Sequence, residues 1–332
     1  MKIQNNYSLK KLNTFAVDVN TKYYIETSNI EVIKELINNK FLEKNNFFIL
    51  GNGSNTLFRK NYDGIIIRYT ANNIKIEKTS DKISCIVDAG MIWDDFIQIT
   101  IKNNIIGFEN LANIPSTVGA AAVQNIGAYG QEQSNYFDYL VAINLLNGKE
   151  TIFYKKDCNF EYRNSIFKNI NNIFLITKVC YSFPTKNTFC TNYPELLNKL
   201  ENKILNSQLI YNTIVEIRNN KLPDINKYPN AGSFFKNPIV SYEQFNVLQK
   251  KHPNIKYFNT KNEIKISAAW LIEQCNWKKK QTGKVSVYEK HSLIIINKKN
   301  ATGQDIYNFS KKIVDSVYKK FNIILEPEIV LL

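Results

Sequence analysis

The stretch NLANIPSTVGAAAVQNIGAYGQE, residues 110–132, carries the strongest structural signal in the chain. It is rich in residues with small side chains: Ser116, Thr117, Gly119, Ala120, Ala121, Ala122, Gly127, Ala128 and Gly130. Such a segment has little side chain to pack, but its backbone N–H groups can approach a flat or extended ligand closely. Tight helix packing is the alternative interpretation. The length of the stretch favours a cradle for a cofactor.

A second glycine-containing segment lies upstream of this stretch. FFIL at 47–50 is typical of a buried strand, and it runs into the turn GNGSN at 51–55. Glycines that follow a strand let backbone N–H groups reach a phosphate. The turn is not a dinucleotide fingerprint, because Thr56 stands where GxGxxG needs its third glycine. An ordinary turn at a strand end is the alternative.

Two further segments place polar groups among aromatic residues. In FEYRNSIFK, residues 160–168, Arg163 stands beside aromatic residues, and its planar guanidinium suits a carboxylate. A structural salt bridge is the alternative. In NAGSFFKNP, residues 230–238, Gly232 and Ser233 indicate a sharp turn that projects a hydroxyl group. This is not the GxSxG elbow of hydrolases, and a serine that caps a turn is the alternative.

The C-terminal segment LEPEIVLL alternates acidic and apolar residues. On a strand, Glu326 and Glu328 would face the same way, although Pro327 lies between them. A solvated edge strand is the alternative interpretation.

The composition bounds the class of protein. The chain has 332 residues, of which 44% are apolar and 22% charged, as in a folded globular protein. No apolar stretch approaches the length of a membrane span, and the N-terminus lacks the apolar core of a secretory signal. We therefore expect a soluble, cytoplasmic protein. The net charge of +14 suits a nucleic-acid partner, but the lysines are scattered, and we expect no nucleic acid.

Cysteine and histidine usage limits the metal chemistry. None of the five cysteines is spaced as CxxC, and their number is odd, which argues against a structural zinc site or a disulfide framework. Because the only histidines are His252 and His291, a three-histidine metal site is impossible. We expect no metal.

The coarse secondary structure is α+β. Apolar periodicity predicts helices at 28–37, where Ser28 and Glu31 have capping-box spacing, and at 93–101, 196–200, 214–218 and 266–275. A long amphipathic helix is predicted around 306–321, with apolar residues along one side. Strands are predicted at 65–67, 83–87, 173–181 and 293–296. A hairpin at 140–154 is expected to turn at Asn147-Gly148 in type I′ geometry.

Taken in order, the motifs resemble a known family. The chain resembles the UDP-N-acetylenolpyruvoylglucosamine reductases of bacterial peptidoglycan synthesis. The motifs that carry this resemblance are GxGSN, ENLxxIPxxVGAAxxQNIGAYGxE, YRxSIFK, KLPD, AGSFFKNP, AAWLIEQC and LEPE. The resemblance covers nearly the whole chain. Tyr193 places it in the subgroup with an extra tyrosine-bearing loop.

The resemblance implies a fold and a cofactor. The family binds FAD non-covalently in a two-part domain of the vanillyl-alcohol-oxidase type, expected at residues 1–220 with a split near 65–70. A smaller α+β substrate domain is expected at 221–332, and its C-terminal segment carries Glu328 back to the active site.

The resemblance also implies a reaction. NADPH delivers hydride to FAD, and the flavin then passes it to the enolpyruvyl group of UDP-N-acetylglucosamine enolpyruvate, which gives UDP-N-acetylmuramate. A monomer without membrane insertion is expected.

Site residues carry over by motif. Arg163 and Glu328 match catalytic residues that stabilise the enol form, and Ser233 matches the proton donor. Tyr162, Tyr193, Lys221 and Asn237 match substrate-binding positions. Predicted FAD contacts are Gly51, Asn52, Gly53, Ser54, Asn55, Ile114, Pro115, Ser116, Thr117, Val118, Gly119, Ala120, Tyr129 and Arg218.

The chain departs from the family pattern at a few positions. Val330 stands where arginine is common, Asn164 stands where aspartate is common, and Ser116 replaces a frequent glycine. Two other functions remain open. One is a related FAD-dependent sugar or alcohol oxidase, and the other is a basic nucleic-acid-binding protein.

Overall fold

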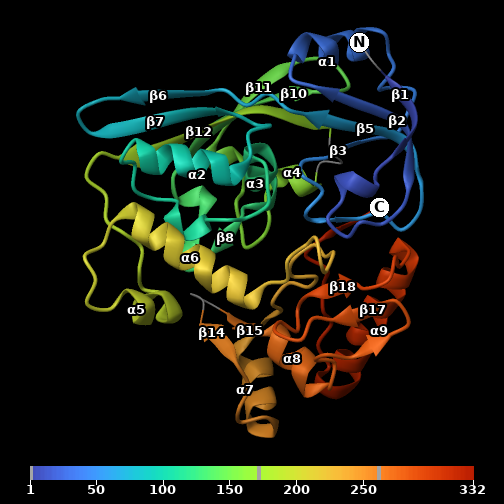
Figure 1. Ribbon diagram of the computed structural model, residues 1–332, viewed down its shortest axis with the longest axis vertical. Coiled ribbons are helices and arrows are strands. Elements are labelled where there is room, and N and C mark those ends of the chain that lie inside the picture. The colour runs from blue at the N-terminus through green and yellow to red at the C-terminus, as the bar shows by residue number, and fades with distance from the viewer. Residues whose placement is uncertain (1–2, 170–172, 260–262) are drawn as a thin grey trace. The chain divides into compact units, whose positions relative to one another are not determined.

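The computed structural model describes residues 3–169, 173–259 and 263–332 (Figure 1). The chain divides into two compact units. The first comprises the described residues up to Tyr7, with Thr21–Asn52 and Asp63–Asn220. The second comprises Ser8–Asn20, Gly53–Tyr62 and Lys221–Leu332. The predicted boundary at 220/221 is one point in the chain, whereas the structure also gives two earlier stretches to the second unit.

The first unit contains two sheets. The smaller has strand order β1 (Gln4–Ser8), β2 (Asn20–Thr27), β5 (Tyr62–Tyr69), β3 (Phe47–Ile49). The larger is antiparallel, in the order β11 (Glu150–Tyr154), β10 (Phe137–Asn144), β12 (Phe174–Pro184), β7 (Lys82–Asp88), β6 (Ile74–Lys78). Because β3 and β5 are parallel, with Phe47 opposite Ile65, the residues that follow both strands lie at one sheet edge.

Helices cover one face of the larger sheet. The first unit carries α1 (Ile30–Asn38), α2 (Trp93–Lys102), α3 (Val118–Gln124), α4 (Ile166–Asn169), α5 (Pro194–Leu200) and α6 (Ser207–Lys221). In Figure 1, α2 and α3 lie against β12 and β7. Their contact is a continuous core in which Trp93, Phe96 and Tyr181 are fully buried and their rings pack against one another.

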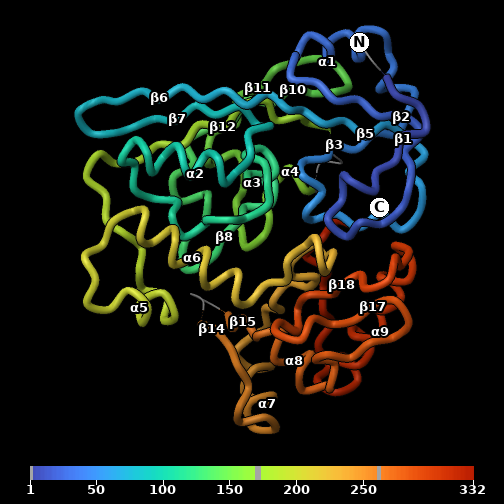
Figure 2. The backbone as a smooth tube through the Cα atoms, viewed as in Figure 1, coloured from blue at the N-terminus to red at the C-terminus, as the bar shows by residue number. Residues whose placement is uncertain are grey.

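The second unit is built from short elements. It contains β13 (Ile239–Val240), β15 (Ile264–Ile266), β14 (Tyr257–Asn259), β16 (Gln281–Thr282), β17 (Val285–Val287) and β18 (Ile295–Asn297). Its helices are α7 (Tyr242–Lys251), α8 (Ala268–Gln274) and α9 (Gly303–Phe321). The last strand, β19 (Val330–Leu331), pairs in parallel with β4 (Thr56–Leu57), so the C-terminus lies beside an early, blue segment of the chain (Figure 2).

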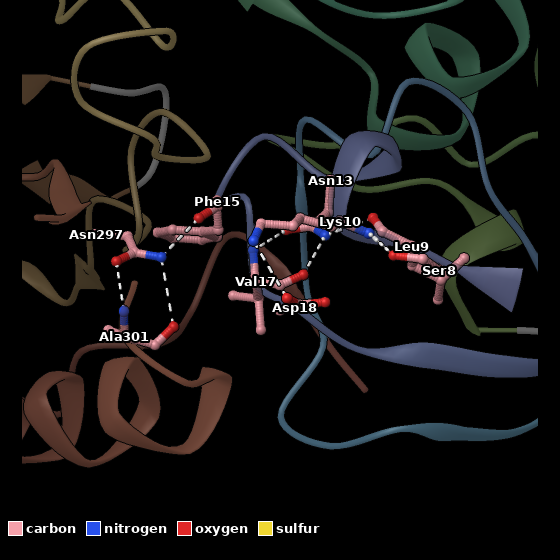
Figure 3. Close-up of polar contacts among 9 residues, drawn as sticks. All are labelled: Ser8, Leu9, Lys10, Asn13, Phe15, Val17, Asp18, Asn297 and Ala301. Atoms are coloured by element: carbon pink, nitrogen blue, oxygen red, sulfur yellow. Dashed lines mark hydrogen bonds and ion pairs between the residues drawn. The ribbon is translucent and has the colours of Figure 1, made fainter. Parts of the chain in front are cut away.

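One buried asparagine closes residues 8–20 on themselves, and a second joins them to the rest of the second unit (Figure 3). Asn13 donates from Nδ2 to the carbonyls of Leu9 (2.7 Å) and Val17 (3.1 Å). Asn297 donates to the carbonyl of Phe15 (2.9 Å) and accepts from the Ala301 N–H (2.7 Å). Each buried amide therefore closes a backbone turn that would otherwise leave polar groups unpaired.

Most predicted elements are present, with two corrections. The helix at 28–37 begins at Ile30, and its N-cap is Asn29, which accepts from the Glu31 N–H at 2.9 Å, so the predicted Ser28 capping box is wrong. Serine and asparagine are equally good N-caps, and Asn29 takes this role because it directly precedes the first helical residue, Ile30. The hairpin is confirmed, but Asn144 pairs with Lys149 across four residues, not two.

The apolar side predicted for the helix around 306–321 is confirmed, because α9 buries Ile306, Phe309, Ile313, Val317 and Phe321. The region around 214–218 is more helical than expected, because α6 spans Ser207–Lys221. No helix within the described ranges is long and apolar enough to cross a membrane.

Candidate functional site

The first unit brings the two glycine-containing stretches together. A Cβ added at Gly51, directly after β3, would lie 3.1 Å from both Ala120 Cβ and Thr117 Oγ1 at the start of α3. Asn52 Nδ2 donates to the carbonyl of Ser116 at 3.4 Å. The sequence predicted both segments as cofactor contacts, and they line one concave cradle.

Two backbone N–H groups at the start of α3 are already hydrogen-bonded to another segment of the chain. The N–H groups of Val118 and Gly119 donate to the carbonyls of Met91 and Ala89, each at 2.9 Å. A Cβ at Gly119 would lie 2.8 Å from Ala89 Cβ. The predicted row of ligand-facing donors is therefore wrong at these two positions, where the glycine serves the tight helix packing named as the alternative.

A pocket of about 370 Å³ adjoins the cradle. It is lined by Gly51, Asn52 and Thr117, which the sequence predicted. It is also lined by residues that sequence reasoning missed: Leu50, Arg68, Tyr69, Thr70, Asn72, Gly90, Met91, Ile92, Asp95 and Ile99. The signal for the residues at 68–72 was the buried run of β5, which ends at the same end of the sheet as β3, where ligands of such sheets commonly bind.

The turn at 51–55 continues into the second unit, and there a close approach of two backbone segments explains the glycine at position 53. Gly53 has φ +61°, and a Cβ there would lie 1.9 Å from the carbonyl oxygen of Leu12. Only glycine fits this approach of two backbone segments. The glycine at this position is thus explained without a phosphate.

Arg218 is a buried cation with an incomplete set of partners. Its Nε is buried and has no hydrogen-bond partner among the described residues. Burial lowers the pKa of Arg218, and the neighbouring Tyr129 and Asp94 oppose that shift. Burial also raises the pKa of Tyr129, and the neighbouring Arg218 opposes that shift. A buried guanidinium of this kind suits an anionic ligand.

The predicted tyrosine-bearing loop is attached to the same region. The ring of Tyr193 packs edge-on against that of Tyr129, with centroids 5.2 Å apart. Buried Asn110 donates from Nδ2 to the carbonyls of Tyr129 and Cys190, both at 2.8 Å. The structure thus places two predicted ligand-binding tyrosines in contact.

Arg163 lies at the tip of a two-residue turn. Glu161 and Asn164 exchange both backbone hydrogen bonds at 3.1 Å, and Arg163 has φ +54°. The guanidinium donates from Nη2 to the carbonyl of Gly127 and lies over the Tyr162 ring, 5.1 Å from its centroid. At the position where aspartate is common, the Asn164 amide donates to the Glu161 carboxylate (3.2 Å).

In the second unit, Ser233 and Glu328 come from two adjacent extended segments. The Glu328 N–H donates to the carbonyl of Phe234 (2.8 Å), and Ser233 pairs with Ile294 on the other side. Gly232 supplies the turn with φ +70° and has open space around its missing Cβ. Asn55 Nδ2 donates to the Glu328 carbonyl (3.4 Å), a structural role for a residue predicted to contact FAD.

The neighbouring acidic residue, Glu326, is not placed like Glu328. Glu326 is exposed and its carboxylate lies 3.8 Å from Lys236 Nζ, whereas Glu328 is half-buried. The solvated-edge interpretation therefore holds for Glu326 alone.

The predicted substrate contacts Lys221 and Asn237 also belong to the second unit. Asn237 Oδ1 accepts from the Ala268 N–H at the start of α8 (2.9 Å), which fixes its carboxamide. Lys221 lies close enough to His291 to influence its pKa. Arg163, Tyr162, Tyr193 and the cradle belong to the first unit, and Ser233, Glu328, Lys221 and Asn237 belong to the second.

His291 predicts a pH dependence of stability. Burial, then Lys221 and Lys278, lower its pKa below the ordinary 6.5, although Glu273 opposes the shift. Below about pH 6.5 the unfolded chain binds a proton at this histidine more readily than the folded chain does. The free energy of unfolding therefore falls as the pH falls. We expect His291→Asn to lose less stability than the unaltered chain between about pH 7.5 and 5.5.

Urea midpoints at the two pH values measure this effect. An identical loss in the His291→Asn variant would contradict the assignment.

Comparisons with known proteins agree with this geometry. Residues 22–153 match the family described as FAD binding domain, and residues 224–332 match UDP-N-acetylenolpyruvoylglucosamine reductase, C-terminal domain. The UDP-N-acetylenolpyruvoylglucosamine reductases of Porphyromonas gingivalis and Flavobacterium johnsoniae are each 39% identical to this chain, with 99% of both chains covered.

A solved structure gives the same result for the fold. The structure of UDP-N-acetylenolpyruvylglucosamine reductase from Thermus caldophilus matches with a TM-score of 0.67 at 20% identity, covering 100% of this chain and 99% of that one. Together with the FAD-binding-domain match, this confirms the predicted α+β fold class.

Proposed function

Because the chain belongs to the UDP-N-acetylenolpyruvoylglucosamine reductase family, we propose that it reduces UDP-N-acetylglucosamine enolpyruvate to UDP-N-acetylmuramate in peptidoglycan synthesis, with FAD as cofactor and NADPH as reductant. The observation that carries this proposal is the 39% identity over 99% of both chains, which includes the FAD-binding part and the C-terminal part alike. In this assignment the enzyme acts as a cytoplasmic monomer, with residues 1–220 for the cofactor and 221–332 for the substrate.

The residues present fit a flavin dinucleotide. A Cβ at position 51 would crowd Thr117 and Ala120, so the glycine lets the turn after β3 approach the start of α3, and the pocket that both segments line provides about 370 Å³. The orphaned Nε of Arg218 suits an anionic part of the ligand. When bound, FAD supplies the hydride carrier between NADPH and the enolpyruvyl group.

The chain's own residues handle the charge and the proton. Hydride addition to the terminal enolpyruvyl carbon builds negative charge that spreads into the adjacent carboxylate. Arg163 stabilises this charge as a cation, and Glu328, as a carboxylic acid, shares its proton with the same carboxylate, so that the enol form is favoured; such groups act most strongly when they are held in place beforehand. Ser233 donates its hydroxyl proton to the neighbouring carbon, and solvent returns a proton to the serine oxygen.

Four residues hold the rest of the substrate. Lys221, Asn237 and Tyr193 bind the uridine-diphosphate portion. Tyr162 orients the substrate beside the guanidinium that it stacks against.

Lys221→Ala and Tyr193→Phe should raise KM for the substrate more than they lower kcat, because both residues act in ground-state binding. Higher salt should reproduce part of the lysine effect, since it screens the diphosphate charge. Steady-state kinetics at two salt concentrations measure both effects. An unchanged KM in both variants would remove these residues from the substrate site.

A simple experiment tests the proposed function. The purified holoenzyme should be yellow, lose its flavin absorption on addition of NADPH without oxygen, and regain it on addition of the enolpyruvyl substrate. Rapid reoxidation by oxygen with a sugar as reductant would instead indicate an oxidase. A colourless protein with salt-sensitive DNA binding would indicate the nucleic-acid-binding alternative.

A further inference from the structure

A buried asparagine joins three segments around the turn that carries Arg163. Asn125 is 1% exposed and ends α3 in the left-handed conformation, with φ 46° and ψ 62°. Its Nδ2 donates to the carbonyl of Glu161 (2.9 Å) and to the carboxylate of Glu132 (3.2 Å). Its Oδ1 accepts from Gln133 Nε2 (3.1 Å). Both amide hydrogens and the carbonyl oxygen are therefore used.

This network has rigid support behind it. Gln133 is fully buried, and its own carbonyl oxygen accepts from the Tyr181 hydroxyl at 3.1 Å. Tyr181 packs within the aromatic core of the larger sheet. A fully satisfied buried network of this kind holds one geometry, because any shift leaves a polar group unpaired.

The same end of α3 holds both arms of the Arg163 turn. Asn125 binds the carbonyl of Glu161 on one arm, and Ser165 Oγ on the other arm donates to the carbonyl of Val123 at 2.7 Å. The guanidinium itself donates to Gly127. A Cβ at Gly127 would lie 3.1 Å from Arg163 Nη1 and 2.8 Å from Glu132 Cγ, so the space on both sides is filled.

The other end of α3 forms the cofactor cradle with Gly51. The helix has seven residues, which corresponds to a length of roughly 10 Å. Its start is pinned to Ala89 and Met91 by backbone hydrogen bonds. One short helix thus connects the predicted cofactor cradle to the predicted catalytic arginine.

We propose that Asn125 is a positioning residue that holds the Arg163 turn on the C-terminal end of α3, and so sets where the guanidinium meets the substrate carboxylate. The inference rests on the proposed function, because it assigns Arg163 a carboxylate ligand. Asn125 itself touches neither substrate nor cofactor in this assignment. Its donors act through Glu161 and Glu132.

The test uses Asn125→Gly in the FAD-loaded enzyme. Glycine accepts the left-handed backbone, so the variant removes the three side-chain hydrogen bonds without adding backbone strain. We expect UDP-N-acetylmuramate, which carries the carboxylate, to bind about 10–100-fold more weakly, as when the hydrogen-bonded support of a site residue is lost. UDP-N-acetylglucosamine, which lacks it, should bind unchanged. Isothermal titration with the two ligands measures the difference.

Two further variants separate positioning from folding. Asn322→Gly alters the same residue type at the same position of α9, where φ is 54°, and should leave both affinities unchanged. Asn125→Asp keeps the shape and the acceptor but loses the donors, so it should fail as the glycine variant does. Normal binding of UDP-N-acetylmuramate by Asn125→Asp would overturn the proposal.

Ser165→Ala removes the hydrogen bond that holds the other side of the Arg163 turn on α3. This variant tests the positioning role even where the Asn125 variants fail to fold. It should weaken binding of the carboxylate ligand selectively and leave the half-reaction with NADPH intact. Equal weakening of both ligands, or no change in either, would overturn the positioning role while the proposed function stands. The proposed function, and this inference with it, would be overturned if NADPH did not reduce the unaltered enzyme and neither nucleotide bound to it.

Discussion

Ser233→Ala should leave the half-reaction with NADPH nearly intact and slow the half-reaction with the enolpyruvyl substrate by about 10²–10⁴-fold, the usual contribution of a positioned proton donor. Only the second half-reaction needs a proton on carbon, so only that one should respond. The serine follows the turn at Gly232 and pairs with Ile294, and the next residue, Phe234, accepts a hydrogen bond from the Glu328 N–H.

Stopped-flow absorbance measures the two half-reactions separately. Ser316→Ala is the matched control, because that hydroxyl donates to the Lys312 carbonyl within α9 (2.8 Å) and should affect neither half-reaction. Equal slowing of both half-reactions by Ser233→Ala would mean that the serine is structural.

Arg163 and Glu328 should act as a unit. Each single variant, Arg163→Lys or Glu328→Gln, should slow the half-reaction with the substrate by about 10²–10³-fold, the cost of losing one group that stabilises developing charge. Lysine keeps the charge but loses the fork that donates to Gly127 while it stacks on Tyr162. Glutamine keeps the shape of Glu328 but removes its charge and acidity.

The double variant decides whether the two residues share one intermediate. Residues that stabilise the same species are non-additive, so the double variant should be little slower than the slower single variant. Single-turnover reoxidation of the reduced enzyme provides the rates. Glu326→Gln is the matched control, because Glu326 is exposed and two residues away. Free energies that summed in the double variant would show that Arg163 and Glu328 work independently.

Local patterns predicted the elements whose signals are local. The apolar stripe of α9, the helix at 93–101 and the hairpin around Gly148 are all present, because side-chain periodicity and turn preference depend on residues a few positions apart. The errors were also local in kind. Ser28 and Asn29 are both good caps, and only the path of the chain into α1 selects Asn29.

Motif order was enough to predict the family and the fold class, because a series of short motifs spread over the chain is highly specific even when each one is weak. It also singled out Gly51 and Thr117, which the structure brings together. Only the tertiary structure shows which packing contacts require a glycine at positions 119 and 53. Gly119 makes room for Ala89 and Gly53 for the Leu12 carbonyl, contacts between segments that are far apart in the chain.

Long-range pairing also decided which unit each segment joins. Residues 8–20 belong to the second unit because Asn297 binds the carbonyl of Phe15, a contact across 282 positions. The role of Asn125 arises in the same way, since its partners Glu132 and Glu161 meet only when the Arg163 turn folds onto α3. Hydrogen-bond partners of a buried amide depend on which backbone groups lack a partner once the chain is packed, and local sequence does not contain that information.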